Sequence, residues 1–306
     1  MNERMFIMMI GLSASGKSTC AKAIKEATII SSDEIRKELF GDYKDQKHNH
    51  LVFEEMRKRI KQSLLFGETV VCDATNLTIK DRKCMLDCVN SVPFDCKKIA
   101  IVCPKSIENC IKDNKYRPNP VPEYVIYNQA KRFQIPFKEE GFDEIILNNL
   151  FDILKTNGVI SEDFQKTIIQ MAEYNQDNPN HKHTLGTHCM SVSQMLWYDD
   201  VLKYSGIMHD YGKMFTKTVD INNISHYYSH ANVGAYILLC NPNLLPHKSA
   251  VDFLDELFYI NYHMNVFDWK NEKTKIKYQK IFGINKYNNL LKINRADIYC
   301  SKGCEE

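Results

Sequence analysis

The sequence predicts an α/β domain with a parallel sheet and helices on both faces, followed by an all-α domain. A glycine-rich loop, residues 11–19, stands directly behind the apolar run of residues 5–10, and short apolar runs alternate with helical stretches up to residue 147. After residue 163 the alternation stops and apolar residues recur at helical spacing. The polar stretch between them divides the chain into expected domains of residues 1–150 and 151–306.

Length and composition limit the class of protein. The chain has 306 residues, enough for two domains that each bury a core. Its hydrophobic content is 44% and its charged content 25%, and no run of about eighteen apolar residues occurs. The start, Met1-Asn2-Glu3-Arg4, has neither the basic region nor the apolar core of a signal peptide. We therefore expect a cytoplasmic protein with no membrane partner.

The charge is nearly balanced. The chain has 40 Lys and Arg residues against 38 Asp and Glu residues, a net charge of +2. This balance excludes the strongly basic surface on which non-specific nucleic-acid binding depends.

Residues 11–19 have the Gly-x4-Gly-Lys-Ser/Thr pattern of a phosphate-binding loop. A buried strand, a glycine turn and a following helix direct several backbone N–H groups at one anion. Lys17 can reach the β- and γ-phosphates of a nucleoside triphosphate, and the Ser18 hydroxyl can ligate Mg²⁺. The predicted nucleotide-binding residues here are Gly11, Ser13, Ser15, Gly16, Lys17, Ser18 and Thr19.

Asp33 and Arg36 share one face of the helix expected within residues 31–41, at the end of a strand. The carboxylate could accept a proton from an attacking hydroxyl while the guanidinium holds a substrate phosphate. Spacing alone slightly favours the alternative of a capping Asp and an ordinary surface Arg.

Two further segments point toward the same region. Asp73 and Asn76 follow the apolar strand of residues 68–73, so they should lie beside the phosphate loop and contact substrate. Arg117 belongs to the proline-braced loop of residues 114–122, a candidate lid over the transferring phosphate. Solvated charges on a connector are the alternative for this loop.

Together these motifs resemble the polynucleotide-kinase-like branch of P-loop kinases, over about residues 5–147. The resemblance implies a P-loop kinase fold with ATP and Mg²⁺ as cofactors. It also implies that Asp33 is the general base, that Arg36 contacts the phosphate of the acceptor and that Arg117 clamps the donor. The branch includes kinases of unknown acceptor, so the resemblance supports phosphoryl transfer better than it supports one substrate.

The second half gathers histidine and aspartate residues on helical segments. Such groups, converging in a helical bundle, can hold divalent metal ions. A lone histidine on a helix is usually structural or solvated, but the adjacent pair His209-Asp210 is harder to explain in that way.

The order His188, His209-Asp210, Asp297 resembles the HD-superfamily phosphohydrolases over roughly residues 164–300. The resemblance implies an all-α HD domain with one or two divalent metals, in which a catalytic Asp210 bridges both. Two-metal members add two histidines, and His230 is preferred to His226 because Val233-Gly234-Ala235 follows it. The implied metal ligands are His188, His209, Asp210, His230, His263 and Asp297. His181, His183 and Lys213 could contact substrate phosphate, although a polar loop explains the first two equally well.

A phosphoryl transferase fused to a phosphohydrolase predicts a bifunctional nucleic-acid end-healing enzyme. It resembles the polynucleotide kinase-phosphatases, which would imply phosphorylation of 5′-hydroxyl ends and removal of 3′-phosphate or 2′,3′-cyclic phosphate in RNA repair. The expected partners are nucleic-acid ends, RNA ahead of DNA, and a separate ligase. A nucleoside or nucleotide kinase joined to a nucleotidase is the alternative, which the weak positive charge favours. A nucleotide-gated regulatory protein is a third, disfavoured because no HD ligand is replaced.

Overall fold

The computed structural model describes residues 4–148, 158–178 and 183–301. The chain divides into two compact units. The first comprises Met1–Gln129 and Pro136–Asn149, and the second Ala130–Ile135 and Leu150–Glu306. The domain boundary predicted at residue 150 lies outside the described residues.

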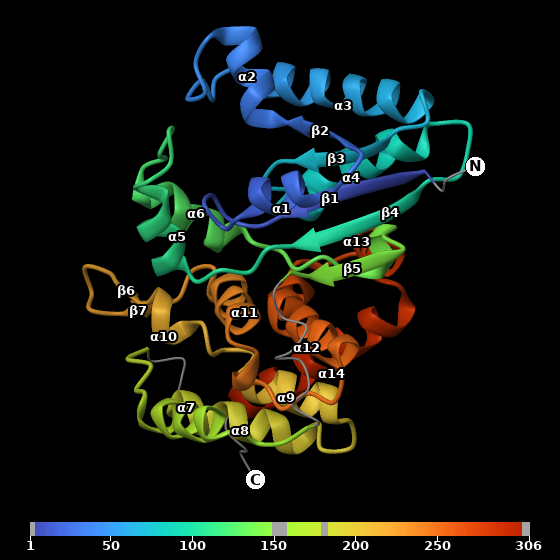
Figure 1. The fold of residues 1–306 in the computed structure, drawn as a ribbon. Coiled ribbons are helices and arrows are strands. Elements are labelled where there is room, and N and C mark those ends of the chain that lie inside the picture. Colours follow the sequence, from blue (N-terminus) through green and yellow to red (C-terminus); the bar gives the residue numbers. More distant parts are fainter. Residues whose placement is uncertain (1–3, 149–157, 179–182, 302–306) are drawn as a thin grey trace. The chain divides into compact units, whose positions relative to one another are not determined.

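Five parallel strands form the sheet of the first unit, in the order β2-β3-β1-β4-β5. Figure 1 shows all five arrows pointing the same way. This arrangement confirms the predicted parallel α/β sheet. The strands are β1 (Met5–Ile10), β2 (Ala27–Ser31), β3 (Thr69–Asp73), β4 (Lys97–Val102) and β5 (Glu144–Leu147).

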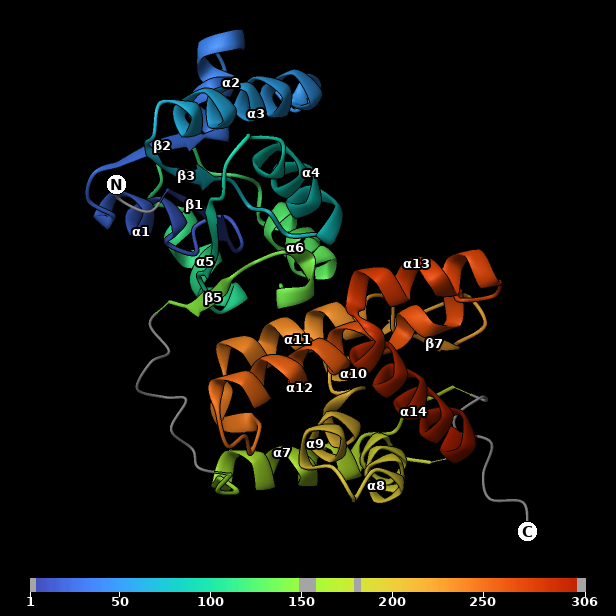
Figure 2. The same ribbon diagram turned by 90° about the vertical axis from the view of Figure 1, so that its right-hand side faces the viewer.

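Helices pack against both faces of this sheet. Helix α1 covers one face, and helix α4 lies against the other (Figure 2). Helix α2 ends at Gly41, whose φ of 72° is a left-handed conformation that glycine adopts readily. The helices are α1 (Lys17–Ala23), α2 (Ser32–Phe40), α3 (Asn49–Leu65), α4 (Ile79–Asn90), α5 (Ile107–Asn114), α6 (Glu123–Arg132) and the 3-10 turn η1 (Lys138–Glu140).

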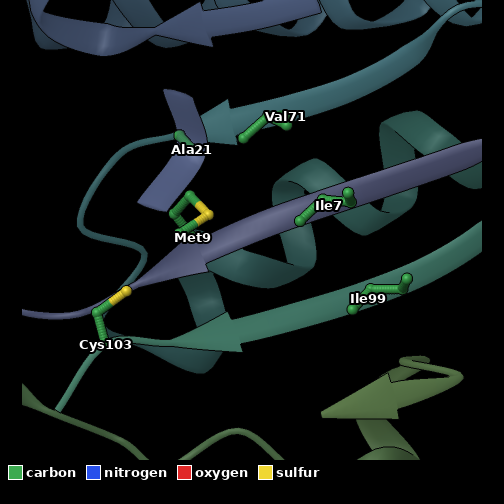
Figure 3. Packing of buried hydrophobic residues seen from close by; sticks show 6 residues of the cluster. All are labelled: Ile7, Met9, Ala21, Val71, Ile99 and Cys103. Atoms are coloured by element: carbon green, nitrogen blue, oxygen red, sulfur yellow. The ribbon is translucent and has the colours of Figure 1, made fainter. Parts of the chain in front are cut away.

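The core beneath α1 fixes the point from which the phosphate loop departs. Ile7 pairs with Val71 on one side and with Ile99 on the other, and Ala21 of α1 packs over them (Figure 3). Residues 6–10 of β1 are all buried, as expected for a central strand covered on both faces. The end of β1 is therefore held firmly in position.

The second unit is mainly helical. Helix α9 packs against α8 and α12, and α11 runs beside α12 (Figure 2). Among the described helices, none combines the length and the apolar character needed to cross a membrane. The helices are α7 (Glu162–Glu173), α8 (Leu185–Met195), α9 (Asp200–Met208), α10 (Lys213–Thr216), α11 (His230–Cys240), α12 (Ala250–Tyr262), α13 (Glu272–Phe282) and α14 (Ile284–Ser301), with the 3-10 turns η2 (Pro242–Leu244) and η3 (His263–Asp268).

A short hairpin distinguishes this unit from the all-α domain predicted from the sequence. Strands β6 (Thr218–Val219) and β7 (Ser225–His226) pair antiparallel. The turn between them forms because Asp220 Oδ1 accepts hydrogen bonds from the backbone N–H groups of Asn222 and Ile224, both at 2.9 Å. Asn223 supplies a left-handed residue with a φ of 62°.

Candidate functional site

Two glycines give the phosphate loop its shape between β1 and α1. A Cβ atom at Gly11 would lie 2.6 Å from Ser15 Oγ and 2.9 Å from the Cys103 carbonyl oxygen, closer than any side chain tolerates. Gly16 has a φ of 94° and immediately precedes the first residue of α1. The loop therefore presents the N-terminus of α1, where free backbone N–H groups favour a bound anion.

Lys17 and Ser18 are both engaged close to this loop. Lys17 Nζ donates to the Leu12 carbonyl oxygen at 2.6 Å, and burial lowers the pKa of its ammonium group although Asp73 acts in the opposite direction. Ser18 Oγ donates to Asp73 Oδ2 at 2.7 Å. Asp73, predicted as a substrate contact, thus lies beside the serine expected to ligate Mg²⁺, and this hydroxyl–carboxylate pair is a donor set that suits that ion. Thr19 is exposed on the same helix.

Asp33 lies between two arginines. Arg36 Nη1 is 2.8 Å from Asp33 Oδ1, and Arg117 Nη2 is 3.5 Å from Asp33 Oδ2. The Asp33 side chain is 51% exposed, whereas Arg36 is buried and held by Asn49 Oδ1 at 2.9 Å. The structure thus brings the predicted base and both predicted phosphate-binding arginines together, with the carboxylate accessible.

Two carboxamides brace the loop region. Asn76 has a φ of 47° and donates from Nδ2 to the Met9 carbonyl oxygen at 2.8 Å, so its buried amide supports the end of β1. Gln129 accepts from the Ser13 N–H at 2.7 Å and donates to Ser13 Oγ at 2.9 Å. The sequence analysis did not single out Gln129, because nothing local in the sequence links a glutamine of α6 to a loop over a hundred residues away.

In the second unit the structure brings all the predicted metal ligands into one buried cluster. They form two triads whose candidate ligand atoms lie within 4.8 Å of one another. The first triad is His188, His209 and Asp297, and the second is Asp210, His230 and His263. His226, the alternative to His230, lies outside the cluster and pairs with Asp220 at 3.0 Å.

Asp210 faces both triads, one oxygen to each. Its Oδ2 is 3.4 Å from His209 Nε2 and 3.8 Å from His188 Nε2. Its Oδ1 is 3.0 Å from His230 Nε2 and 3.8 Å from His263 Nε2. A carboxylate in this position can bridge two cations.

Close backbone packing brings the Asp210 segment to the start of α11. A Cβ atom at Gly212 would lie 2.0 Å from the His230 carbonyl oxygen, and one at Gly234 would lie 2.9 Å from the Gly212 nitrogen. Only glycine allows the two segments to approach this closely. Gly234, four residues after His230, therefore allows α11 to pack directly against the segment that carries Asp210.

The hydrogen bonds of the histidines indicate that they are suited to bind metal. His209, His230 and His263 each place Nδ1 at 2.7 or 2.8 Å from the backbone carbonyl oxygen three residues earlier. An Nδ1–H that donates to a carbonyl leaves Nε2 with a free lone pair. The Nε2 atoms of His230 and His263 then face each other at 3.2 Å, and those of His188 and His209 have no hydrogen-bond partner among the described residues. Divalent cations would satisfy these converging lone pairs.

The charged side chains of the cluster shift one another's pKa values. Burial alone would raise the pKa of Asp210, but the ammonium of Lys213, 2.7 Å away, and the neighbouring His209 hold that pKa well below its ordinary value. Burial, with repulsion from His209 and His230, lowers the pKa of His263 to about 3. Lys213 also donates to Gln176 Oε1 at 3.0 Å. Burial opposes it, but the carboxylate of Asp210 raises the pKa of His209 well above its ordinary value. The Asp210 carboxylate and the neutral His263 imidazole are thus in the protonation states that a metal requires, whereas a bound metal would displace a proton from His209.

A cavity of about 530 Å³ opens onto this cluster. Asp210, Lys213, His230 and Asp297 are among the residues that line it. Lys213, predicted to contact phosphate, therefore faces the space next to the Asp210 carboxylate. His183 is exposed and is not one of the cavity-lining residues, and His181 lies outside the described residues.

Comparisons with known proteins bear on the first unit. A family model described as an AAA domain matches residues 6–136, the part of the chain that carries the phosphate loop and most of the parallel sheet. The match and the sheet agree with the predicted α/β P-loop kinase fold for this part of the chain. The search of curated proteins gave no match.

Several solved structures are partly similar to the chain. A chain of the Pnkp1/Rnl/Hen1 complex matches with a TM-score of 0.31 and 20% identity over 36% of this chain and 38% of that one. A chain of the Pnkp1/Rnl/Hen1 RNA repair complex matches with a TM-score of 0.37 and 16% identity over 43% and 44%. A gluconokinase from Sinorhizobium meliloti 1021 gives 0.34 and 19% over 47% and 81%. The matched region spans less than half the length of the two repair-complex chains.

Proposed function

We propose that this chain heals nucleic-acid ends in RNA repair. One unit would use ATP to phosphorylate 5′-hydroxyl ends, and the other, an HD-type phosphohydrolase, would remove 3′-phosphate or 2′,3′-cyclic phosphate. The observation that carries the proposal is the presence in one chain of an Asp33 carboxylate between two arginines and of two triads of candidate metal ligands, with the Asp210 carboxylate facing the histidines of both. The products, 5′-phosphate and 3′-hydroxyl ends, are those that a separate ligase needs.

In the proposed kinase reaction the carboxylate of Asp33 takes the proton of the attacking 5′-hydroxyl. Arg36 holds the phosphate that follows the terminal nucleoside of the acceptor, and Arg117 stabilises the transferred phosphoryl group. Lys17 leaves the Leu12 carbonyl to contact the β- and γ-phosphates. Ser18 and Asp73 would hold Mg²⁺, which when bound neutralises phosphate charge.

In the proposed phosphohydrolase reaction, His188, His209 and Asp297 would hold one cation and His230 and His263 the other, with Asp210 shared. Such cations, when bound, act as Lewis acids on phosphate oxygens. Lys213 keeps Asp210 ionised and correctly oriented, and its ammonium draws an anionic substrate into the cavity. The tautomers fixed by backbone carbonyls keep the imidazole lone pairs directed at the centre of the cluster.

A small-molecule enzyme, a nucleoside or nucleotide kinase joined to a nucleotidase, is the second candidate. The net charge of +2 favours it, because a long nucleic-acid substrate is usually met by a more basic surface. Both candidates use the same reacting groups and differ in the acceptor.

An end-group assay separates the two candidates. The protein is incubated with γ-labelled ATP and, in parallel, a 5′-hydroxyl RNA, a 5′-hydroxyl DNA and free nucleosides. The same protein, loaded with Mn²⁺, is given RNA with a 3′-phosphate or a 2′,3′-cyclic phosphate. We expect label on RNA and release of the 3′ block. Label on nucleosides alone would replace the first candidate with the second, and inertness toward every 3′-phosphorylated end would remove the healing role.

A further inference from the structure

The cavity in front of the metal cluster has an aromatic wall that the proposed phosphate chemistry does not use. Tyr228 lines the cavity, and the residue is 69% exposed. One face of its ring stacks on His226, with ring centroids 5.6 Å apart and an interplanar angle of 8°. Because this stack accounts for one face, the exposure of the ring leaves the other available to a planar ligand.

The hairpin holds this wall in place. His226 ends β7, and its Nε2 lies 3.0 Å from Asp220 Oδ2 at the start of the hairpin turn. The His226 imidazole that stacks on Tyr228 is therefore held in place by Asp220. Ser229, with a φ of 62°, then turns the chain directly into the ligand His230. Only Ser229 separates Tyr228 from His230 along the chain, and both residues line the same cavity.

A second apolar group reaches the cavity from the segment that follows the other histidine of the triad. Met264 and Phe267 of η3 lie one and four residues after His263, line the same cavity and are 41% and 44% exposed. Asn265 lies between them and also lines it. Exposed apolar side chains thus adjoin both His230 and His263, while Lys213 and Asp210 supply the charge.

We propose that the cavity binds a nucleotide, with its base stacked on the open face of Tyr228 and its phosphate at the end formed by Asp210 and Lys213. This inference rests on the proposed phosphohydrolase function and names Tyr228 as the residue that selects substrates bearing a nucleobase. Neither an inorganic phosphate nor a sugar phosphate has a planar aromatic face that could stack on an exposed ring beside the cluster. A base gains stacking energy of similar size whatever its identity, so selection is for the presence of a base rather than for a sequence. The volume of about 530 Å³ is in the range of small-molecule sites.

The kinetic test compares a substrate that has a base with one that lacks it. Adenosine 3′-monophosphate and its base-free analogue, 1,4-anhydroribitol 3-phosphate, are hydrolysed by wild type, Tyr228→Leu and Tyr228→Phe. For Tyr228→Leu we expect KM for the adenosine compound to rise about 5- to 150-fold with little change in kcat, and KM for the base-free analogue to stay the same. Tyr228→Phe keeps an aromatic face and should remain within about threefold of wild type.

A matched control uses Tyr198, another exposed tyrosine of this unit, which is not among the residues that line the cavity. Tyr198→Leu should leave both KM values unchanged. A rise of KM for both substrates in Tyr228→Leu, or for neither, would overturn the inference.

Equilibrium binding separates a failure of this inference from a failure of the proposed function. Calorimetry with adenosine 3′-monophosphate and with the base-free analogue is done on full-length Lys17→Ala protein, so that the phosphate loop does not compete. Binding of the adenosine compound that Tyr228→Leu weakens supports the inference, even if no hydrolysis is seen and the proposed function falls. Hydrolysis of both compounds with equal affinity would keep the function and remove the role of Tyr228.

Discussion

The first unit builds its phosphate loop from consecutive residues, whereas the second unit draws its candidate metal ligands from segments spread between residues 188 and 297. In the phosphate loop the main chain supplies most of the binding groups, and glycines at positions 11 and 16 make that backbone geometry possible. In the cluster the side chains supply them, and backbone carbonyls only orient the imidazoles. A site built from the main chain can therefore be predicted from a short sequence motif. A site built from side chains depends on how helices that are distant in the sequence pack together.

The two sites also differ in burial. Burial decides whether a substitution changes activity alone or also destabilises the fold. Asp33 is half exposed and can be changed without disturbing a core, but Asp210 is buried against Lys213 at 2.7 Å. Removing Asp210 leaves a buried ammonium without its partner, which destabilises a protein by about 3–5 kcal/mol. Experiments on the cluster must therefore monitor folding as well as activity.

The largest effect is expected from Asp210→Ala. Because Asp210 faces both triads, its loss should remove both metals and reduce phosphohydrolysis to background, while kinase activity changes less than about twofold. Elemental analysis, an end-group assay and circular dichroism are measured on the same sample. Asp210→Asn retains the side-chain volume and gives the same reading if the alanine variant fails to fold.

Two histidines only four positions apart provide the control for that experiment. His230→Ala should lose metal preferentially from the second triad, whereas His226→Ala, which removes an imidazole outside the cluster, should keep the metal content of wild type. Equal metal content in wild type, Asp210→Ala, His230→Ala and His226→Ala would contradict the assignment of the cluster.

Asp33→Asn is expected to be next in size. It keeps the shape of the side chain and a hydrogen-bond acceptor but removes the proton acceptor, so kcat for phosphoryl transfer should fall about 10²- to 10⁴-fold. Release of 3′-phosphate should be unaffected. Kinase activity within threefold of wild type would leave Asp33 as a structural partner of Arg36 and Arg117.

Lys17→Ala should reduce phosphoryl transfer about 10²- to 10³-fold, because one preorganised positive charge next to the transferred group is lost. Lys22→Ala, an exposed lysine on the same helix, is the matched control and should behave as wild type. Both variants are assayed for both activities. A parallel loss of phosphohydrolysis in a folded Lys17→Ala protein would show that the two activities do not belong to separate sites.

The contrast between the sites also explains which features could be predicted from the sequence. The buried strands, the phosphate loop and the position of Asp73 at the end of β3 follow from local patterns, and the structure confirms the parallel sheet. The metal-ligand cluster was predicted from a family resemblance in the order of its histidines and aspartates. No local pattern in the sequence indicates that these distant residues come together.

Other features depended on contacts with no local pattern. The bonds from Gln129 to Ser13 and from Arg36 to Asn49 join segments distant in sequence. The β6–β7 hairpin was missed because its strands are two residues long, too short for an alternating pattern to emerge. Tyr228 was missed because exposure and stacking on His226 exist only in the fold.

The last prediction concerns stability rather than activity, and it starts from a comparison of one buried glutamate in each unit. In the first, Glu140 pairs with Arg82 at 2.6 Å. In the second, Glu256 is buried, and its Oε2 has no hydrogen-bond partner among the described residues. Burial, together with the nearby carboxylates of Asp252, Asp200 and Asp255, raises the pKa of Glu256 to about 9. The folded state therefore keeps a proton that the unfolded chain, with an ordinary value of 4.5, releases.

The stability of the folded protein should therefore fall as the pH rises between these two pKa values. The stability contributed by this proton is fully present below pH 4.5 and is lost as the pH rises from there toward 9. Glu256→Gln stays neutral throughout, so its free energy of unfolding relative to wild type should increase by about 4 kcal/mol between pH 5 and pH 8. Urea unfolding followed by tryptophan fluorescence reports on the second unit, because both tryptophans, Trp197 and Trp269, belong to it. Glu162→Gln, at an exposed position on α7, should show no such pH-dependent difference. If the free energies of unfolding of Glu256→Gln and wild type changed with pH in parallel, Glu256 would be ionised in the folded protein and paired with a cation.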